Sequence, residues 1–206
     1  MAMPWGAREV FLAFVMWAVM MVGMMTAPAA PVLLLYARTQ SSRDRTGVPG
    51  AVLLFGLGYI TVWLGFSACA AMMQWALHQG ALLSPAMSAS SRYLAGAILI
   101  AAGAYQLTPL KRACLTQCQS PLGFLMGHWR TGKSGSFWMG LRHGAYCLGC
   151  CWALMLVLFA VGVMNLAWVA VLAGFILVEK IGPPGALVSR IGGAIMIAFG
   201  VGLIAA

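Results

Sequence analysis

The segment from His143 to Met155, HGAYCLGCCWALM, is rich in side chains that bind soft metal ions. Residues at every fourth position share one face of an α-helix. This segment has four such side chains at that spacing: His143, Cys147, Cys151 and Met155. Cys150 follows Cys147 by three residues and joins the same face. Thiols and thioethers select Cu(I), and imidazole accepts copper or zinc, so the segment predicts a soft-metal site with Cu(I) favoured over Zn. A redox thiol pair and a packing seam of small residues remain as alternatives.

Cys114 and Cys118 provide a second group of thiols, in the polar connection LKRACLTQCQSP. Lys111 and Arg112 precede them, and positive charges favour the thiolate over the thiol. Thiolates at such a spacing bind metals or exchange disulfides. We therefore expect this pair to share the chemistry of the CLGCC segment, with incidental loop cysteines as the alternative.

The first apolar stretch contributes thioethers in two neighbouring helical rows, which include Met20, Met21, Met24 and Met25. Methionine rows are more often flexible core filler than ligands. Pro28 and Pro31 follow these methionines and are expected to distort the helix. Because the methionines fall at the same expected depth as the cysteines, we interpret them as a weaker thioether path to the same site.

Composition places the chain in a membrane. Of its 206 residues, 63% are hydrophobic and 7% are charged, and the mean hydropathy is +0.94. Such a chain must be dissolved in the lipid bilayer. Its only acidic residues are Glu9, Asp44 and Glu179, which argues against carboxylate-pair catalysis and oxygen-ligand calcium or magnesium sites. The net charge of +9 comes from basic residues that flank apolar stretches, so we expect no nucleic-acid partner.

The chain is expected to form an all-α, polytopic membrane bundle. About 20 apolar residues are needed to cross a bilayer. Six stretches approach this length: 9–36, 50–77, 92–108, 137–163, 166–181 and 186–205. The polar segments between them are too short to fold separately, so residues 1–206 are predicted to form one domain of about six transmembrane helices. The first apolar stretch is longer than the core of a signal peptide, and we expect it to be retained.

The basic residues predict the orientation of this bundle. With six crossings, both termini lie on one side, and most Lys and Arg residues fall in connections on the other side: Arg38, Arg43, Arg45, Lys111, Arg112, Arg130, Lys133, Lys180 and Arg190. Connections rich in Lys and Arg stay in the cytoplasm. Both termini are therefore predicted outside, and the thiols in the cytoplasmic half of the membrane.

Three segments resemble the motifs of a bacterial family of predicted metal-binding integral membrane proteins, some of which are described as copper chaperones. The segments are WAVMMVGMMTAPAAP, YQLTPLKRACLTQC and HGAYCLGCCWALM. The resemblance covers residues 12 to 180, approximately. It implies a soft metal such as Cu(I), with five cysteines at the motif positions: Cys114, Cys118, Cys147, Cys150 and Cys151.

These observations favour a multi-pass protein of the bacterial inner membrane that binds Cu(I) and passes it to a partner cuproprotein or its assembly machinery. Ligand exchange would move the ion, and no catalytic residue is expected. Cys114 and Cys118 would accept or release copper, while Cys147, Cys150 and Cys151 would hold it. The nearby cations Lys111, Arg112 and Arg142 would offset the thiolate charge before metal enters.

Two other functions remain open on the sequence alone. The first is a membrane thiol-disulfide oxidoreductase that uses Cys114/Cys118 and Cys147/Cys150 as exchanging pairs. The second is a structural subunit of a larger metalloenzyme complex, in which small residues form surfaces for partner helices. The glycines available for such surfaces are Gly56, Gly58, Gly65, Gly192, Gly193 and Gly200.

Overall fold

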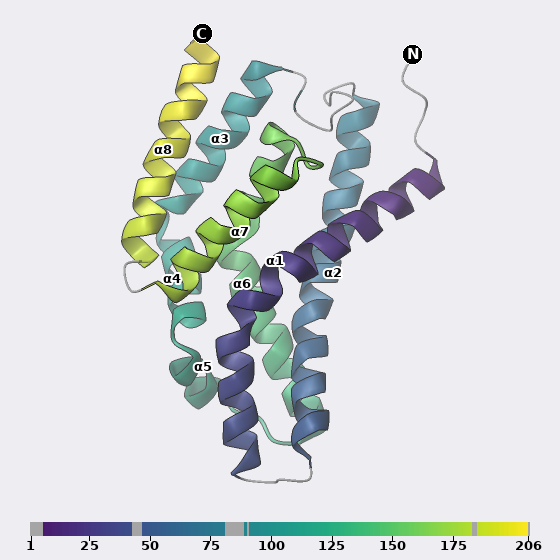
Figure 1. The fold of residues 1–206 in the computed structure, drawn as a ribbon, viewed down its shortest axis with the longest axis vertical. Coiled ribbons are helices and arrows are strands. Elements are labelled where there is room, and N and C mark those ends of the chain that lie inside the picture. The colour runs from purple at the N-terminus through teal and green to yellow at the C-terminus, as the bar shows by residue number, and fades with distance from the viewer. Residues whose placement is uncertain (1–5, 43–46, 81–88, 90, 183–184, 206) are drawn as a thin grey trace.

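A computed structural model describes residues 6–42, 47–80, 89, 91–182 and 185–205, and these form eight helices (Figure 1). In chain order the helices are α1 (Ala7–Ser41), α2 (Val48–Gln79), α3 (Arg92–Gln106), α4 (Pro109–Gln119), α5 (Pro121–His128), α6 (Gly132–Val161), α7 (Leu166–Ile181) and α8 (Gly185–Ala205). The prediction of an all-α chain is confirmed for these residues. α6 occupies the centre, with α1 and α2 on one side and α3, α7 and α8 on the other.

The number of helices that could span a membrane is smaller than predicted. Among the described residues, four helices are long and apolar enough to cross a bilayer: α1, α2, α6 and α8. The number rises to five if α3 and α4 count as one broken span, because these helices are bent by 64° at a short break. The prediction of about six spans was therefore wrong.

The shortfall comes from α7 and from the break after α3. α7 has 16 residues, which at 1.5 Å per residue gives about 24 Å, less than the thickness of a bilayer core of about 30 Å. The 15 residues of α3 end where Thr108 caps α4 and Pro109 opens it. Figure 1 shows the result for α7: its C-terminal end and the start of α8 lie part-way down the molecule, near α4.

α1 changes direction along its length (Figure 1). Pro28 and Pro31 lie inside this 35-residue helix, and proline cannot supply the N–H that bonds the preceding turn. The bend lets α1 cross the face of the bundle in its first part and run beside α2 in its second part.

α2 and α6 approach each other closely through glycine. A Cβ atom on Gly140 would lie 1.9 Å from the carbonyl oxygen of Phe55, and one on Gly58 would lie 2.2 Å from the carbonyl oxygen of Phe137. Neither backbone could stay in place beside a larger residue. This contact holds the thiol-bearing helix α6 firmly against α2.

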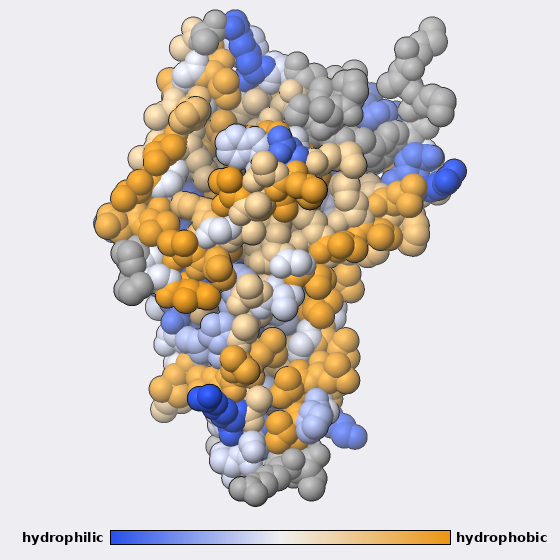
Figure 2. All heavy atoms as spheres, viewed as in Figure 1, coloured by the Kyte–Doolittle hydropathy of each residue, from blue (hydrophilic) through white to orange (hydrophobic). Residues whose placement is uncertain are grey.

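The surface of the molecule fits a membrane protein. Large apolar side chains are exposed on its flanks, among them Leu34, Leu53, Val171, Ile195 and Phe199. In the space-filling view, hydrophobic residues cover most of the visible face, and strongly hydrophilic residues gather mainly in its upper and lower parts (Figure 2). Two basic residues predicted to lie in cytoplasmic connections are instead inside the protein, since Lys111 is 0% exposed and Lys180 is 5% exposed.

Candidate metal centre

The inner face of α6 presents the predicted thiols. Cys147, Cys150 and Cys151 are 2%, 0% and 0% exposed, and His143 is 2% exposed one turn earlier. They form one face of the helix, as their spacing predicts, and this face points into the core between α1, α4 and α7. The thiols of Cys150 and Cys151 donate hydrogen bonds to the carbonyl oxygen of Cys147, at 3.0 and 2.9 Å.

α4 brings the two remaining motif cysteines to α6. The Sγ atoms of Cys118 and Cys150 lie 3.9 Å apart. Cys114 packs against Gly149, where a Cβ atom would come within 2.8 Å of its sulfur. All of these cysteines are free thiols. Cys114 and Cys118 are only partly buried, whereas the α6 thiols are buried, so α4 forms the more accessible edge of the cluster.

Lys180 of α7 lies among three sulfur atoms. Its Nζ is 2.8 Å from the Sγ of Cys147, 3.8 Å from the Sγ of Cys151 and 3.9 Å from the Sδ of Met25. A buried ammonium is costly unless a negative charge compensates it. Because the thiols of Cys150 and Cys151 point to a carbonyl oxygen, Cys147 is the sulfur best placed to carry that negative charge.

Tyr59 of α2 completes the surroundings of Cys147. Its hydroxyl donates to the carbonyl oxygen of Met25 at 3.0 Å and lies 3.0 Å from the Sγ of Cys147. The ring of Tyr59 stacks on His143, with ring centroids 5.9 Å apart. Tyr59 thus links α1, α2 and α6 at the level of the thiols.

His143 has mostly aromatic neighbours. Besides Tyr59, its ring contacts Phe55 and Phe124, at centroid distances of 6.1 and 4.9 Å. Its Nδ1 is buried and has no hydrogen-bond partner among the described residues. The imidazole therefore lies at the edge of the thiol cluster, in an apolar setting.

The methionines differ in their positions. The Sδ atom of Met25 lies 3.9 Å from the Nζ of Lys180, the ammonium that also contacts Cys147 and Cys151. Met21 and Met24 are buried and Met20 is partly buried, and all three belong to the hydrophobic core that surrounds the sulfur cluster. All four methionines therefore lie in or against the core that holds the cysteines, and Met25 is linked to the thiols through Lys180.

An ion pair joins α4 to α7 beside the cluster. Lys111 Nζ lies 2.6 Å from a carboxylate oxygen of Glu179, and both side chains are 0% exposed. Gln119 donates to the carbonyl oxygen of Glu179 at 2.8 Å. These contacts fix α4, and therefore Cys114 and Cys118, at a defined position next to α6.

The cations expected to balance the thiolates were assigned wrongly. Lys111 is paired with Glu179, whereas Arg112 and Arg142 are exposed, and the sulfur atoms instead have Lys180 as their cation. Sequence reasoning missed Lys180 and Tyr59 as members of the site. The sequence feature that could have indicated Lys180 is the charged pair Glu179–Lys180 at the end of an apolar stretch. Such a pair is also typical of a helix that ends at the membrane surface.

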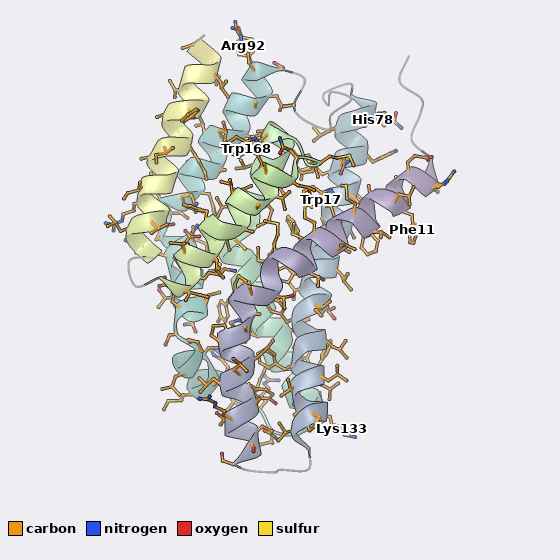
Figure 3. All side chains as sticks on the ribbon, in the orientation of Figure 1. Phe11, Trp17, His78, Arg92, Lys133 and Trp168 are labelled. Atoms are coloured by element: carbon orange, nitrogen blue, oxygen red, sulfur yellow. The ribbon has the colours of Figure 1, made fainter. Side chains whose placement is uncertain are left out.

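Packed side chains lie in the part of the bundle between the thiols and the start of α1. Trp17 of α1 points inward and donates to Gln74 of α2 at 2.7 Å (Figure 3). Its ring lies 5.2 Å from the ring of Phe159 on α6. The cysteine of α2, Cys69, is exposed, as are Met72 and Met73, so these residues do not extend the cluster.

The sulfur cluster does not form a complete metal-binding geometry in this structure. Among the residues that the structure describes, no three His, Cys, Asp or Glu side chains are arranged to hold a metal ion together. The space between Cys147, Cys151 and Met25 is taken by the Lys180 ammonium. A metal ion at this point would need the ammonium to withdraw.

One comparison with known proteins gives a match. The model of a family described as "PpoB2: Copper chaperone" matches residues 14–203. No curated protein and no solved structure matches the chain.

Proposed function

Because the chain belongs to this copper chaperone family, we propose that it carries Cu(I) on buried sulfur ligands and delivers it to a partner cuproprotein. The position of Lys180 is the observation that supports this proposal most directly. Its ammonium is a monovalent cation within 3.9 Å of two thiol sulfurs and one thioether sulfur. A site that already accommodates a positive charge among three sulfurs suits Cu(I) in both ligand type and charge.

The proposed ligands divide into an entry pair and a holding set. Cys118 and Cys150 form the entry pair, with Cys114 beside them on the accessible edge. Cys147, Cys151 and Met25 form the holding set around the position of the ammonium. Copper would pass between the sets by ligand exchange, one sulfur replacing another, and His143 would assist from the edge of the cluster. This transfer requires no catalytic residue.

Cu(I) fits this ligand set better than Zn. Structural zinc sites are closed tetrahedra of four Cys or His ligands, whereas the holding set offers two thiols and a thioether. Thioethers are soft ligands that select Cu(I). The role of Met25 therefore supports copper as the cargo.

Copper binding by purified protein tests the proposal. We expect the variant Cys147→Ala/Cys151→Ala to lose the copper that the wild-type protein binds stoichiometrically under anaerobic conditions. The matched control is Cys69→Ala, which removes an exposed thiol outside the cluster and should leave copper content unchanged. Equal copper in the double variant and the control would disprove the proposal.

The 3.9 Å separation of the Cys118 and Cys150 sulfurs favours a thiol-disulfide oxidoreductase as the second candidate. A small movement of α4 would bring these atoms to bonding distance, which is about 2.05 Å. Alkylation of the isolated protein before and after reduction separates the two functions. A carrier is expected to show all thiols free, whereas an oxidoreductase should be isolated partly with a Cys118–Cys150 disulfide.

We also propose that the protein lies in the bacterial inner membrane with the α4 edge of the cluster toward the cytoplasm. The exposed basic residues support this orientation, because several of them lie in or beside the connection between α5 and α6. Arg130 and Lys133 are examples. Copper would then be exchanged on the cytoplasmic side.

A further inference from the structure

A hollow separate from the sulfur cluster lies between the end of α5 and the outward side of α6. Its volume is about 700 Å³, and its polar lining consists of His128, Arg130 and Arg142. Two indole rings, those of Trp129 and Trp138, also line it. Arg142 and Cys147 are five residues apart on α6, which places them about 140° apart around the helix axis. The hollow and the thiols are therefore on different sides of α6.

The hollow is positively charged, and no carboxylate lines it. Within the described part of the chain, the carboxylates are those of Glu9 and Glu179. Glu9 accepts a hydrogen bond from the first residue before α1, and Glu179 pairs with Lys111. Arg130 and Arg142 are both exposed. Guanidinium groups form their strongest hydrogen bonds with phosphate and carboxylate groups, often in pairs of parallel bonds.

The position of the hollow suits a ligand with both an anionic and an apolar part. It lies at the end of the molecule where α6 begins, and Figure 3 places Lys133 at this end and Arg92 at the opposite end. Val62 and Ala145 provide an apolar wall. Nearby, Leu122 and Met126 of α5 and Trp138 of α6 are 58%, 77% and 52% exposed. Exposed apolar and indole side chains beside basic residues are typical of the membrane interface.

We propose that this hollow binds an anionic phospholipid, with the lipid phosphate between Arg130 and Arg142 and the glycerol and upper acyl chain along the apolar wall. Basic pockets beside transmembrane helices recognise anionic headgroups in this way. The bound lipid would connect the end of α5 to α6. This inference does not depend on copper binding.

Lipid retention by purified protein tests this site. The variant Arg130→Gln/Arg142→Gln removes both guanidinium groups, and the control Arg92→Gln/Arg190→Gln removes two exposed arginines outside the hollow. Native mass spectrometry after delipidation and addition of phosphatidylglycerol would measure binding. We expect the wild-type protein and the control to retain phosphatidylglycerol, and the hollow variant to bind it at least about tenfold more weakly. Circular dichroism of each variant verifies that its helices are intact.

Two further measurements separate the sources of phosphate. Phosphatidylcholine has the same acyl chains without a net negative charge, and equal retention of this lipid would overturn the proposal. Inorganic phosphate alone, added in detergent, should not raise the midpoint of thermal unfolding. If it protects the wild-type protein as strongly as phosphatidylglycerol does, the ligand is a soluble phosphate and the lipid assignment is wrong. Equal phosphatidylglycerol binding by the hollow variant and the control would also overturn the proposal that the hollow is a phospholipid site.

Discussion

Lys180 is a buried lysine whose ammonium contacts sulfur atoms. These sulfur atoms belong to Met25 of α1 and to Cys147 and Cys151 of α6, at 2.8 to 3.9 Å. Charged residues within the bilayer are costly, and they commonly mark functional sites. The contact of 2.8 Å with Cys147 makes this thiol the natural counter-charge of the ammonium.

This pairing predicts the effect of removing the ammonium. In Lys180→Met, Cys147 loses its compensating cation, so the protein without copper should hold about one thiolate fewer per chain. The ultraviolet absorbance of thiolates measures this change. Lys133→Met, which removes an exposed lysine, is the control and should absorb like the wild-type protein. Unchanged thiolate absorbance in Lys180→Met would contradict the pairing.

At the residue scale, the sequence predicted the sulfur atoms better than their partners. The spacing of Cys147, Cys150 and Cys151 follows directly from helical periodicity, which is a local property. The contacts with Lys180 and Tyr59 depend on how α7 and α2 pack against α6, and no spacing rule contains that information. For the same reason, the methionines looked alike in the sequence although Met25 alone among them contacts Lys180 in the described residues.

At the scale of helices, the contact between α2 and α6 depends on the absence of side chains. Gly140→Ala would place a methyl group against the backbone of Phe55, so the helices must separate. Overpacking of this kind costs about 1–3 kcal/mol, and the variant should unfold at a lower temperature in detergent. Gly56→Ala lies on α2 with open space around it, and it should unfold at the wild-type temperature or slightly above. Equal midpoints for the two variants would show that the contact tolerates a side chain.

The lengths of the helices also explain why six spans were predicted. Apolar composition identifies stretches that dissolve in lipid, and α3 and α7 have this composition. It does not show where a stretch stops inside the membrane. α7 ends with Glu179 and Lys180, which resemble a polar boundary in the sequence but are satisfied internally by Lys111 and by the thiols. Some of the glycines considered for partner helices have internal roles instead, because Gly58 faces α6 and Gly193 and Gly200 face α3, whereas Gly56 and Gly65 have open space around them.

At the scale of the whole molecule, charge predicts the orientation in the membrane. Single cysteines introduced as Lys133→Cys and Arg92→Cys would mark the two ends of the bundle (Figure 3). A membrane-impermeant maleimide applied to spheroplasts should label Arg92→Cys at once and Lys133→Cys only after permeabilisation, since basic connections remain in the cytoplasm. The wild-type protein gives the background labelling. The reverse pattern would place the α4 edge of the cluster outside.

The packing of Trp17 against Gln74 and Phe159 has a consequence for the path of the proposed copper cargo. These side chains are almost fully buried, and they close the bundle between the sulfur atoms and the end where α1 begins. On the proposed function, a copper ion that enters past α4 would meet these packed side chains and would leave by the way it entered. The protein would then bind and release copper on one side without transporting it across the membrane. Vesicles that contain it are expected to accumulate no copper in their lumen.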